Sequence, residues 1–504
     1  MIELDGNSLT LDQLVAIAHE FAPVAIGGEA RARVQAARTV VDEFADREEP
    51  AYGINTGFGS FADVKIPHDS LSQLQVNLLR SHAAGVGEPL PVPVVRAAMA
   101  LRANVLAKGF SGIRISTLDL LVEILNRRIH PLVPSRGSVG ASGDLAPLAH
   151  IALVLIGEGA VVDSNGVVDG RAALARAGLD PASLGPKEGL ALINGTQPST
   201  ALLGLALAAA WRLARAADIA AALSIDGLQG STKPFDARIH EARGLPTQAV
   251  SAANLRQLLA GSGINAHHAN CGRVQDAYSM RCAPQVHGAA RSACQFAHDV
   301  FAAEANAATD NPMVFTETRE IVSGGNFHGA PVAVACDLLC IGMSQLATIS
   351  ERRSDRLVNP ALSGLPAFLT RHGGLHSGLM MAQVTAAALT SELKTLAHPA
   401  SVDSIPTSGN KEDHVSMSMA AALKAARTVE LATQVLAVEL LCACQAIDLL
   451  KPLATAAPLA RVHEFIRTRV PTLDEDRPPA RDLDVITTMI ERGELERACA
   501  MNVN

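Results

Sequence analysis

Five long stretches of helix-forming residues dominate this 504-residue chain after its first two hundred residues, and they constrain its fold more than any other feature. They span residues 198–226, 284–308, 329–357, 376–398 and 415–450. Irregular stretches with Gly, Pro and Asn separate them. Because apolar residues recur along each stretch at helical spacing, the pattern predicts long helices that pack on one another.

The composition indicates what holds such helices together. Apolar residues make up 48% of the chain but aromatic residues only 3%, so the core must consist mainly of Ala, Leu and Val. Small side chains allow helix axes to approach closely. We therefore predict a mostly α fold, with an N-terminal α-rich domain at residues 1–195 and a long antiparallel helical bundle with a C-terminal helical region at 196–504.

Several protein classes are disfavoured by the sequence. A net charge of −8 argues against a nucleic-acid partner, and no uninterrupted apolar run reaches the length of a membrane span. The first residues, MIELDGNSLT, lack the features of a signal peptide. The eight cysteines show no metal-ligand or disulfide spacing, which favours reduced thiols and no metal. We predict a cytoplasmic protein.

A glycine-rich segment, GSVGASGDLAP at residues 137–147, precedes an apolar stretch and is open to two ordinary interpretations. A phosphate-binding loop would need Gly-Lys-Ser/Thr at its end, whereas Asp144 at this place would repel phosphate. An ordinary loop would use Ser142 and Asp144 to cap a helix that begins near Leu145. Other segments of the chain are needed to choose between these two interpretations and a catalytic role for the segment.

Five further irregular segments concentrate polar side chains between the expected helices. They are YGINTGFG from Tyr52, NGTQ from Asn194, QDAYSMR from Gln275, GGNFH from Gly324 and NKEDH from Asn410. The two tyrosines of the chain, Tyr52 and Tyr278, both fall within these segments, which indicates a chemical use of their hydroxyl groups. Together with the Ala-Ser-Gly triplet, and in this order, the segments resemble the aromatic amino acid ammonia-lyases over nearly the whole chain.

That resemblance implies a prosthetic group made from the chain itself. Members of the family convert an Ala-Ser-Gly triplet into the electrophile 4-methylideneimidazol-5-one, here from Ala141, Ser142 and Gly143. Gly143 has no Cβ, so its nitrogen can be pressed onto the Ala141 carbonyl, and the Ser142 hydroxyl can leave as water. The resemblance also implies the helical fold of ammonia-lyases and fumarases, and neither a metal nor a nucleotide is expected.

Two positions favour histidine as the substrate. Ser81-His82 stands where lyases of phenylalanine or tyrosine carry Phe-Leu or His-Leu, and Glu412 stands where those enzymes carry glutamine; both are as in histidine-specific members. Each side chain can hydrogen-bond a ring nitrogen, and each would be costly to leave unpaired beside a phenyl ring. The resemblance therefore implies elimination of ammonia from L-histidine to give trans-urocanate, the first step of histidine degradation.

The two tyrosines receive proton-transfer roles. We expect Tyr52 to be the base that removes the β-proton of the substrate. An unperturbed tyrosine has a pKa of about 10, so ionisation near pH 7 predicts a pKa lowered by about three units, with helix N-termini near the loop supplying part of the shift. Tyr278 is expected to relay a proton or orient a reacting group.

The remaining site residues are expected to bind the substrate or the prosthetic ring. Arg281 would form a bidentate clamp on the substrate carboxylate. Asn194 and Gln275 would orient the amine and the exocyclic oxygen of the ring. Phe327 would pack against the ring, and Met380 would form an apolar wall of the pocket.

Three alternatives remain open at this point. A tyrosine or phenylalanine ammonia-lyase, or a 2,3-aminomutase, would use the same prosthetic group. A scaffold that kept the fold and lost the activity is the third. The family assembles as tetramers whose active sites draw on three subunits, so the resemblance also implies a homotetramer with shared sites.

Overall fold

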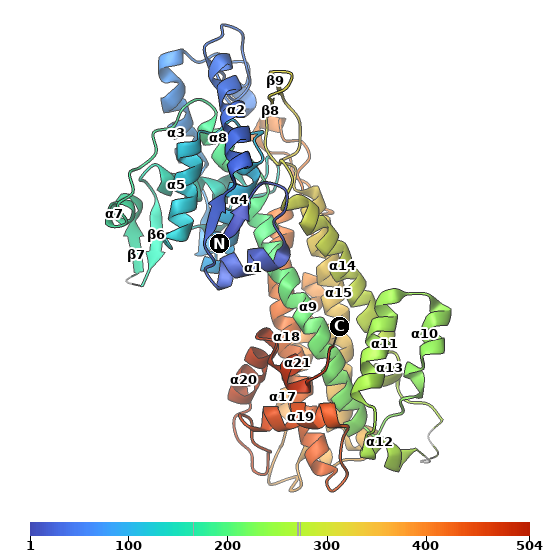
Figure 1. Cartoon of the computed structure of the whole chain (residues 1–504). Coiled ribbons are helices and arrows are strands. Elements are labelled where there is room, and N and C mark those ends of the chain that lie inside the picture. The colour runs from blue at the N-terminus through green and yellow to red at the C-terminus, as the bar shows by residue number, and fades with distance from the viewer. Residues whose placement is uncertain (165, 270–271, 273, 504) are drawn as a thin grey trace. The chain divides into compact units, whose positions relative to one another are not determined.

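The computed structural model describes residues 1–164, 166–269, 272 and 274–503. Helices predominate and strands are short, which confirms the predicted mostly α fold (Figure 1). Internal contacts divide the chain into two compact units. Unit 1 comprises residues 1–208, 297–337 and 399–423, and unit 2 comprises residues 209–296, 338–398 and 424–504. The domains predicted at 1–195 and 196–504 follow chain order and stay a prediction.

The core of unit 1 is built around helix α4 (Val92–Ala107), which is buried from Val94 to its last residue. Three helices pack against it: α1 (Leu11–His19), α2 (Gly28–Ala45) and α5 (Ile115–Asn126). A second group packs together beside them: α3 (Leu71–His82), α6 (Leu145–Leu155), α7 (Gly170–Arg176) and α8 (Glu188–Ile193). Short 3-10 turns lie at Gly59–Phe61, His68–Ser70 and Ser408–Asn410.

The strands of unit 1 form small sheets that connect these helices. β1 (Ile2–Leu4) pairs in parallel with β2 (Val24–Ile26), Ile2 lying opposite Val24. The antiparallel pairs are β3 (Val86–Pro89) with β5 (Pro134–Arg136), β6 (Ala160–Asp163) with both β4 (His130–Pro131) and β7 (Gly166–Asp169), and β8 (Met313–Phe315) with β9 (Glu320–Val322).

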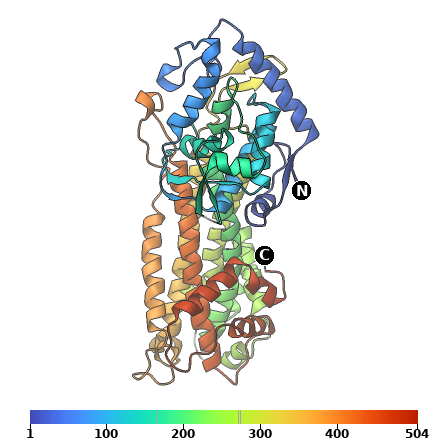
Figure 2. The same ribbon diagram turned by 90° about the vertical axis from the view of Figure 1, so that its left-hand side faces the viewer.

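The five predicted long helices are present and differ from the expected ranges by only a few residues at their ends. They are α9 (Gln197–Gly227), α14 (Ala283–Glu304), α15 (Ala330–Val358), α17 (Met380–Leu396) and α18 (Ser418–Leu449). Figures 1 and 2 show their unit 2 portions lying side by side. A Cβ placed on Gly227 of α9 would lie 3.0 Å from Ala446 and 3.4 Å from Leu357, so small residues bring these helices close, as the composition predicted.

Contacts within unit 2 give the direction of each long helix. Along α9 from Ala214 to Asp218, the partners on α14 run backwards from Arg291 to His287, so these two helices are antiparallel. α17 is likewise antiparallel to α15, because Ser344 contacts Leu393 while Glu351 contacts Gln383. α9, α15 and α18 share one direction, as the neighbours of Gly227 and the bonds of Glu439 to Ser224 and Arg353 indicate. Successive long helices therefore alternate, which gives the predicted antiparallel bundle.

Short helices complete unit 2. They are α10 (Ala237–Arg243), α11 (Pro246–Leu258), α12 (Gly263–His268), α13 (Tyr278–Arg281), α16 (Pro360–Ser363), α19 (Ala457–Arg467), α20 (Ala480–Glu491) and α21 (Glu494–Cys499), with 3-10 turns at Lys233–Phe235 and Ala367–Leu369.

Three of the long helices correct the prediction that no segment could span a bilayer, which counted only uninterrupted apolar runs. By length and composition alone, α9, α15 and α18 are long and apolar enough to cross a membrane. Their most apolar windows are 67%, 72% and 89% buried inside the protein, respectively. Packing within the protein accounts for their apolar character.

Candidate active site

The loop that carries the Ala-Ser-Gly triplet lies directly before two helix N-termini. Gly143 and Gly195 form a short parallel bridge, and the amide of Asp144 donates to the Gly195 carbonyl at 2.8 Å. Helices α6 and α9 begin within two residues of this bridge. Gly143 has φ +70°, and a Cβ on it would lie 2.8 Å from the Gly195 Cα and closer still to its carbonyl group. Only glycine fits this backbone approach.

Asp144 corrects the interpretation of this segment as an ordinary capped loop. It precedes α6, but its carboxylate makes no capping bond to that helix. It accepts hydrogen bonds from the Ser138 hydroxyl at 2.7 Å and from the Ser199 amide in the first turn of α9 at 2.8 Å. Complete burial raises the pKa of Asp144 despite these bonds. The carboxyl group thus links the loop to the N-terminus of α9, not to the helix that follows it.

Five predicted site residues line one cavity of about 720 Å³ in unit 1. They are Tyr52, His82, Ser142, Asn194 and Glu412. His82 is the last residue of α3, and Asn194 is the C-cap of α8. Tyr52 and Glu412 lie in loops that precede and follow, respectively, the short turns Gly59–Phe61 and Ser408–Asn410. Residues from distant parts of the sequence thus meet at Ser142.

Glu412 is held by hydrogen bonds at both carboxylate oxygens. The Ser142 hydroxyl donates to Oε1 at 2.7 Å. The hydroxyls of Thr407 and Ser408 donate to Oε2 at 2.6 and 2.9 Å. Burial alone would raise the pKa of Glu412, but these hydrogen bonds and the nearby His82 outweigh burial and lower it. The side chain is therefore a carboxylate at neutral pH.

Asn194 contacts the backbone of the triplet. Its Nδ2 donates to the Ser142 carbonyl at 3.0 Å, while its Oδ1 is buried and has no hydrogen-bond partner among the described residues. Arg102 fixes the backbone behind it, because its Nη1 donates to the Asn194 carbonyl at 2.7 Å and its Nε to the Ala191 carbonyl at 2.9 Å. Burial lowers the pKa of Arg102 only to about 10, so its charge is retained.

His82 has a defined tautomer. Its Nδ1 lies 2.9 Å from the Leu78 carbonyl, which can only accept, so Nδ1 carries a proton. Burial lowers the pKa of His82, although the Leu78 bond and the charge of Glu412 oppose the effect. The ring is therefore neutral near pH 7, and its Nε2 is a hydrogen-bond acceptor. The cavity combines this acceptor with the carboxylate of Glu412.

Tyr52 differs from the prediction in the direction of its pKa shift. Burial raises the pKa of its phenol; a hydrogen bond from the Gly59 amide opposes the rise, and the negative charge of Glu412 adds to it. The expected lowering by helix N-termini is wrong for this structure, in which the phenol is protonated. Its ring packs edge-on against Phe58, with centroids 6.4 Å apart.

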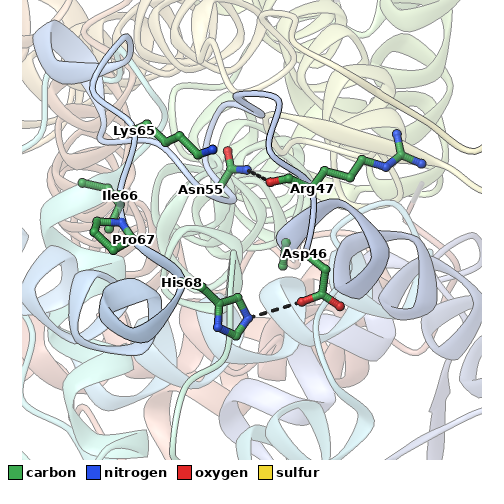
Figure 3. Close-up of a pocket in the computed structure, with 8 residues that line it drawn as sticks. Asp46, Arg47, Asn55, Lys65, Ile66, Pro67 and His68 are labelled. Atoms are coloured by element: carbon green, nitrogen blue, oxygen red, sulfur yellow. Dashed lines mark hydrogen bonds and ion pairs between the residues drawn. The ribbon is translucent and has the colours of Figure 1, made fainter.

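Asn55 fixes the backbone of the segment that carries Tyr52. Its side chain is 2% exposed, accepts from the Ala51 amide at 2.7 Å, and donates to the carbonyls of Glu49 and Arg47 at 3.0 and 3.3 Å. Figure 3 shows the bond to Arg47 at the edge of a second cavity, of about 530 Å³, which Asn55 also lines. Ile66 lines both cavities.

The other predicted site residues lie elsewhere. Gln275 and Arg281 line a cavity of about 330 Å³ in unit 2. Beside them, Tyr278 is 71% exposed, and the Arg281 guanidinium carbon lies 4.5 Å from its ring centroid. Met380 is the first residue of α17 in unit 2. Phe327 belongs to unit 1 but is not among the residues that line the Ser142 cavity.

Sequence reasoning missed three residues of this arrangement. Thr407 and Ser408 precede Glu412 in TSGNKE, where the Gly-Asn pair signals a turn that could have suggested their contact with the carboxylate. Arg102 gave no signal, because a basic residue in an apolar helix is usually assigned to a solvated face. Within the described ranges, no group of three or more His, Cys, Asp or Glu side chains could hold a metal ion.

Comparison with known proteins identifies the family of the chain. A family model described as aromatic amino acid lyase matches residues 9–468. A histidine ammonia-lyase of Anaeromyxobacter sp. (strain K) is 57% identical over 502 residues, covering 98% of this chain and 99% of the relative. One of Myxococcus xanthus (strain DK1622) is 51% identical over 494 residues, covering 98% and 97%.

Solved structures give the same result for the fold. A histidine ammonia-lyase structure from Trypanosoma cruzi is 45% identical, with a TM-score of 0.92, and covers 99% of this chain and 95% of that one. A tyrosine aminomutase structure from Streptomyces globisporus is 38% identical, with a TM-score of 0.95, and covers 100% of both chains.

Proposed function

The chain belongs to the aromatic amino acid lyase family, and on that premise we propose that it eliminates ammonia from L-histidine to give trans-urocanate. One observation carries the choice of substrate: His82 and Glu412 line the same cavity as Ser142. A neutral histidine acceptor and a carboxylate complement a ring with N–H donors, which imidazole has and phenyl or phenol rings lack. Both would be left unpaired beside an aromatic hydrocarbon ring.

The residues around the triplet fit the prosthetic group that the family implies. Gly143 has φ +70° and packs against the Gly195 backbone where no side chain fits, and Asn194 has a buried, unpartnered Oδ1 beside Ser142. We propose that Ala141, Ser142 and Gly143 form 4-methylideneimidazol-5-one autocatalytically, with loss of two waters. When present, the group supplies an electrophile that makes the substrate amine a better leaving group.

The cavity residues then bind and deprotonate the substrate. The imidazolium form of the substrate ring has two N–H donors, one for Glu412 and one for the Nε2 of His82, and these two bonds orient the β-carbon. Asn194 fixes the backbone at residue 142 through its bond to the carbonyl. Tyr52 accepts the β-proton through its phenolate; the positive charge of a bound substrate favours that form and offsets the raised pKa found without substrate.

We assign further residues outside this cavity to the substrate and the prosthetic ring. Gln275, Tyr278 and Arg281 lie together in unit 2: Arg281 would clamp the substrate carboxylate, Gln275 would orient the amine or the exocyclic oxygen of the ring, and Tyr278 would relay a proton or orient a reacting group. Phe327 would pack against the prosthetic ring, and Met380 would form an apolar wall of the pocket. We propose a homotetramer in which several subunits contribute to each site, acting in the cytoplasm. Light scattering of the purified protein tests the assembly.

The substrate assignment is tested by kcat/KM for L-histidine in His82→Leu and Glu412→Gln variants. His82→Leu removes a hydrogen bond to the ring and Glu412→Gln removes the charge that strengthens one, so we expect kcat/KM to fall about tenfold or more in each variant. Unchanged values in both variants would refute the assignment of the ring to this cavity. An exposed control, Thr39→Val on α2, should leave kcat/KM unchanged, because the Thr39 hydroxyl bonds only to its own helix.

A further inference from the structure

The loop that presents Glu412 has an unusual backbone. Thr407 and Glu412 form an antiparallel bridge, with the Thr407 amide 2.9 Å from the Glu412 carbonyl. Between them, Ser408, Gly409 and Asn410 have φ of +51°, +61° and +72°. A left-handed conformation costs a non-glycine residue about 1–2 kcal/mol. Such a conformation persists only where surrounding contacts compensate for it, and these regions cluster at functional sites.

The compensating contacts converge on one carboxylate oxygen. The turn brings the Thr407 and Ser408 hydroxyls to 2.6 and 2.9 Å from Glu412 Oε2. A carboxylate oxygen has about two acceptor sites, so Oε2 is saturated. Oε1 accepts one hydrogen bond, from the Ser142 hydroxyl at 2.7 Å. The proposed formation of the prosthetic group removes this hydroxyl as water. Oε1 is therefore the oxygen left for the substrate.

We infer that Thr407 and Ser408 are positioning residues for Glu412: by occupying Oε2 they direct Oε1 toward the substrate ring and keep the carboxylate ionised. This inference rests on the proposed histidine lyase function and deepens it. A purely structural role would be to hold the shape of the left-handed turn, and loss of the hydroxyls would then lower the free energy of unfolding without shifting the acid limb of kcat/KM. The two roles therefore predict different behaviour when the hydroxyls alone are removed.

The charged groups that face Glu412 determine which ionisations appear in the pH profile of kcat/KM. His82 and Tyr52 interact with it by charge from the neighbouring elements. Lys411 and Asp413, on its own segment, are exposed. Because His82 is neutral near pH 7 and Tyr52 is protonated there, the acid limb of kcat/KM reports protonation of the ring acceptors, Glu412 among them.

The test uses the full-length enzyme with Thr407→Val, Ser408→Ala and the double variant, with Thr407→Ser as the conservative replacement and Thr39→Val as the matched control. Removing hydroxyl donors destabilises the carboxylate, so the acid limb should move up by about one pH unit in the double variant, and kcat/KM for histidine should fall about tenfold. Thr407→Ser should restore the wild-type profile. Urocanate binding, followed calorimetrically against pH, should show the same shift without turnover.

The outcomes separate this inference from the function on which it rests. If the wild-type enzyme does not convert histidine, the proposed function fails. If it does, but the variants keep the wild-type acid limb and the wild-type urocanate affinity, the positioning role is refuted. Intact mass checks a second route: if both single variants fold but lack the two-water loss, the hydroxyls serve formation of the prosthetic group and the inference is overturned. Should Thr407→Val not fold, Ser408→Ala carries the same test.

Discussion

Replacing Gly143 by alanine should disrupt the site through a single methyl group. The new Cβ would lie 2.8 Å from the Gly195 Cα, whereas ordinary contacts begin at 3.4 Å, and the obstacle is backbone, which cannot rotate away. The alanine would also hold φ at +70°. The left-handed conformation costs about 1–2 kcal/mol and overpacking about 1–3 kcal/mol, so we expect about 2–5 kcal/mol lost in the free energy of unfolding.

Gly178 provides a matched control for the cost of placing alanine in a left-handed backbone conformation. It has φ +67°, and an added Cβ would meet nothing within 4 Å. Gly178→Ala should therefore cost only about 1–2 kcal/mol. Urea unfolding of both variants measures the difference, and intact mass shows whether residues 141–143 still lose two waters. Equal destabilisation of the two variants, with normal mass loss in Gly143→Ala, would refute the close approach of Gly143 and Gly195.

Three further outcomes are expected. Ser142→Ala should fold and assemble but keep the full chain mass and lose nearly all turnover; substantial activity would exclude the cyclised triplet. Glu412→Gln should reduce kcat for histidine with less than about 1 kcal/mol change in unfolding free energy, since glutamine keeps the size of the side chain and one acceptor oxygen for the hydroxyl donors. Burial, with the charges of Arg96 and Arg128, lowers the pKa of His130 from 6.5 to about 4. Between pH 6.5 and pH 4 the unfolded state therefore binds more protons than the folded state, so the free energy of unfolding falls as the pH drops through this range. His130→Gln should remove about 1–2 kcal/mol of that loss after solvent screening, measured by urea unfolding at pH 7 and pH 4.5; an identical loss in wild type and variant would contradict it.

The sequence predicted the long helices and five residues that line one cavity, but not the geometry of that cavity. Helical periodicity and an Ala-rich composition suffice for α9 and α18, because packing in a bundle follows from the apolar stripe. The partner of Asp144 was not predictable, since Ser199 is remote in sequence and nothing local brings it near. The direction of the Tyr52 pKa shift depends on burial and on the charge of Glu412, which only the folded chain brings together.

The left-handed turn before Glu412 shows a further limit of predicting structure from the sequence. Serine at position 408 is a poor candidate for positive φ, so propensity argues against the conformation that the structure adopts. Local preference yields where tertiary contacts compensate, here the hydroxyl bonds to Glu412. Departures of this kind are expected at functional or strained sites.

The measurement that tests the central claim most directly is the ultraviolet spectrum of the purified protein mixed with L-histidine, run beside L-tyrosine and L-phenylalanine. The cavity that joins His82 and Glu412 to Ser142 predicts a growing urocanate band with histidine alone. A coumarate or cinnamate band, or no product from histidine in protein whose mass shows the completed loss of two waters, would contradict it.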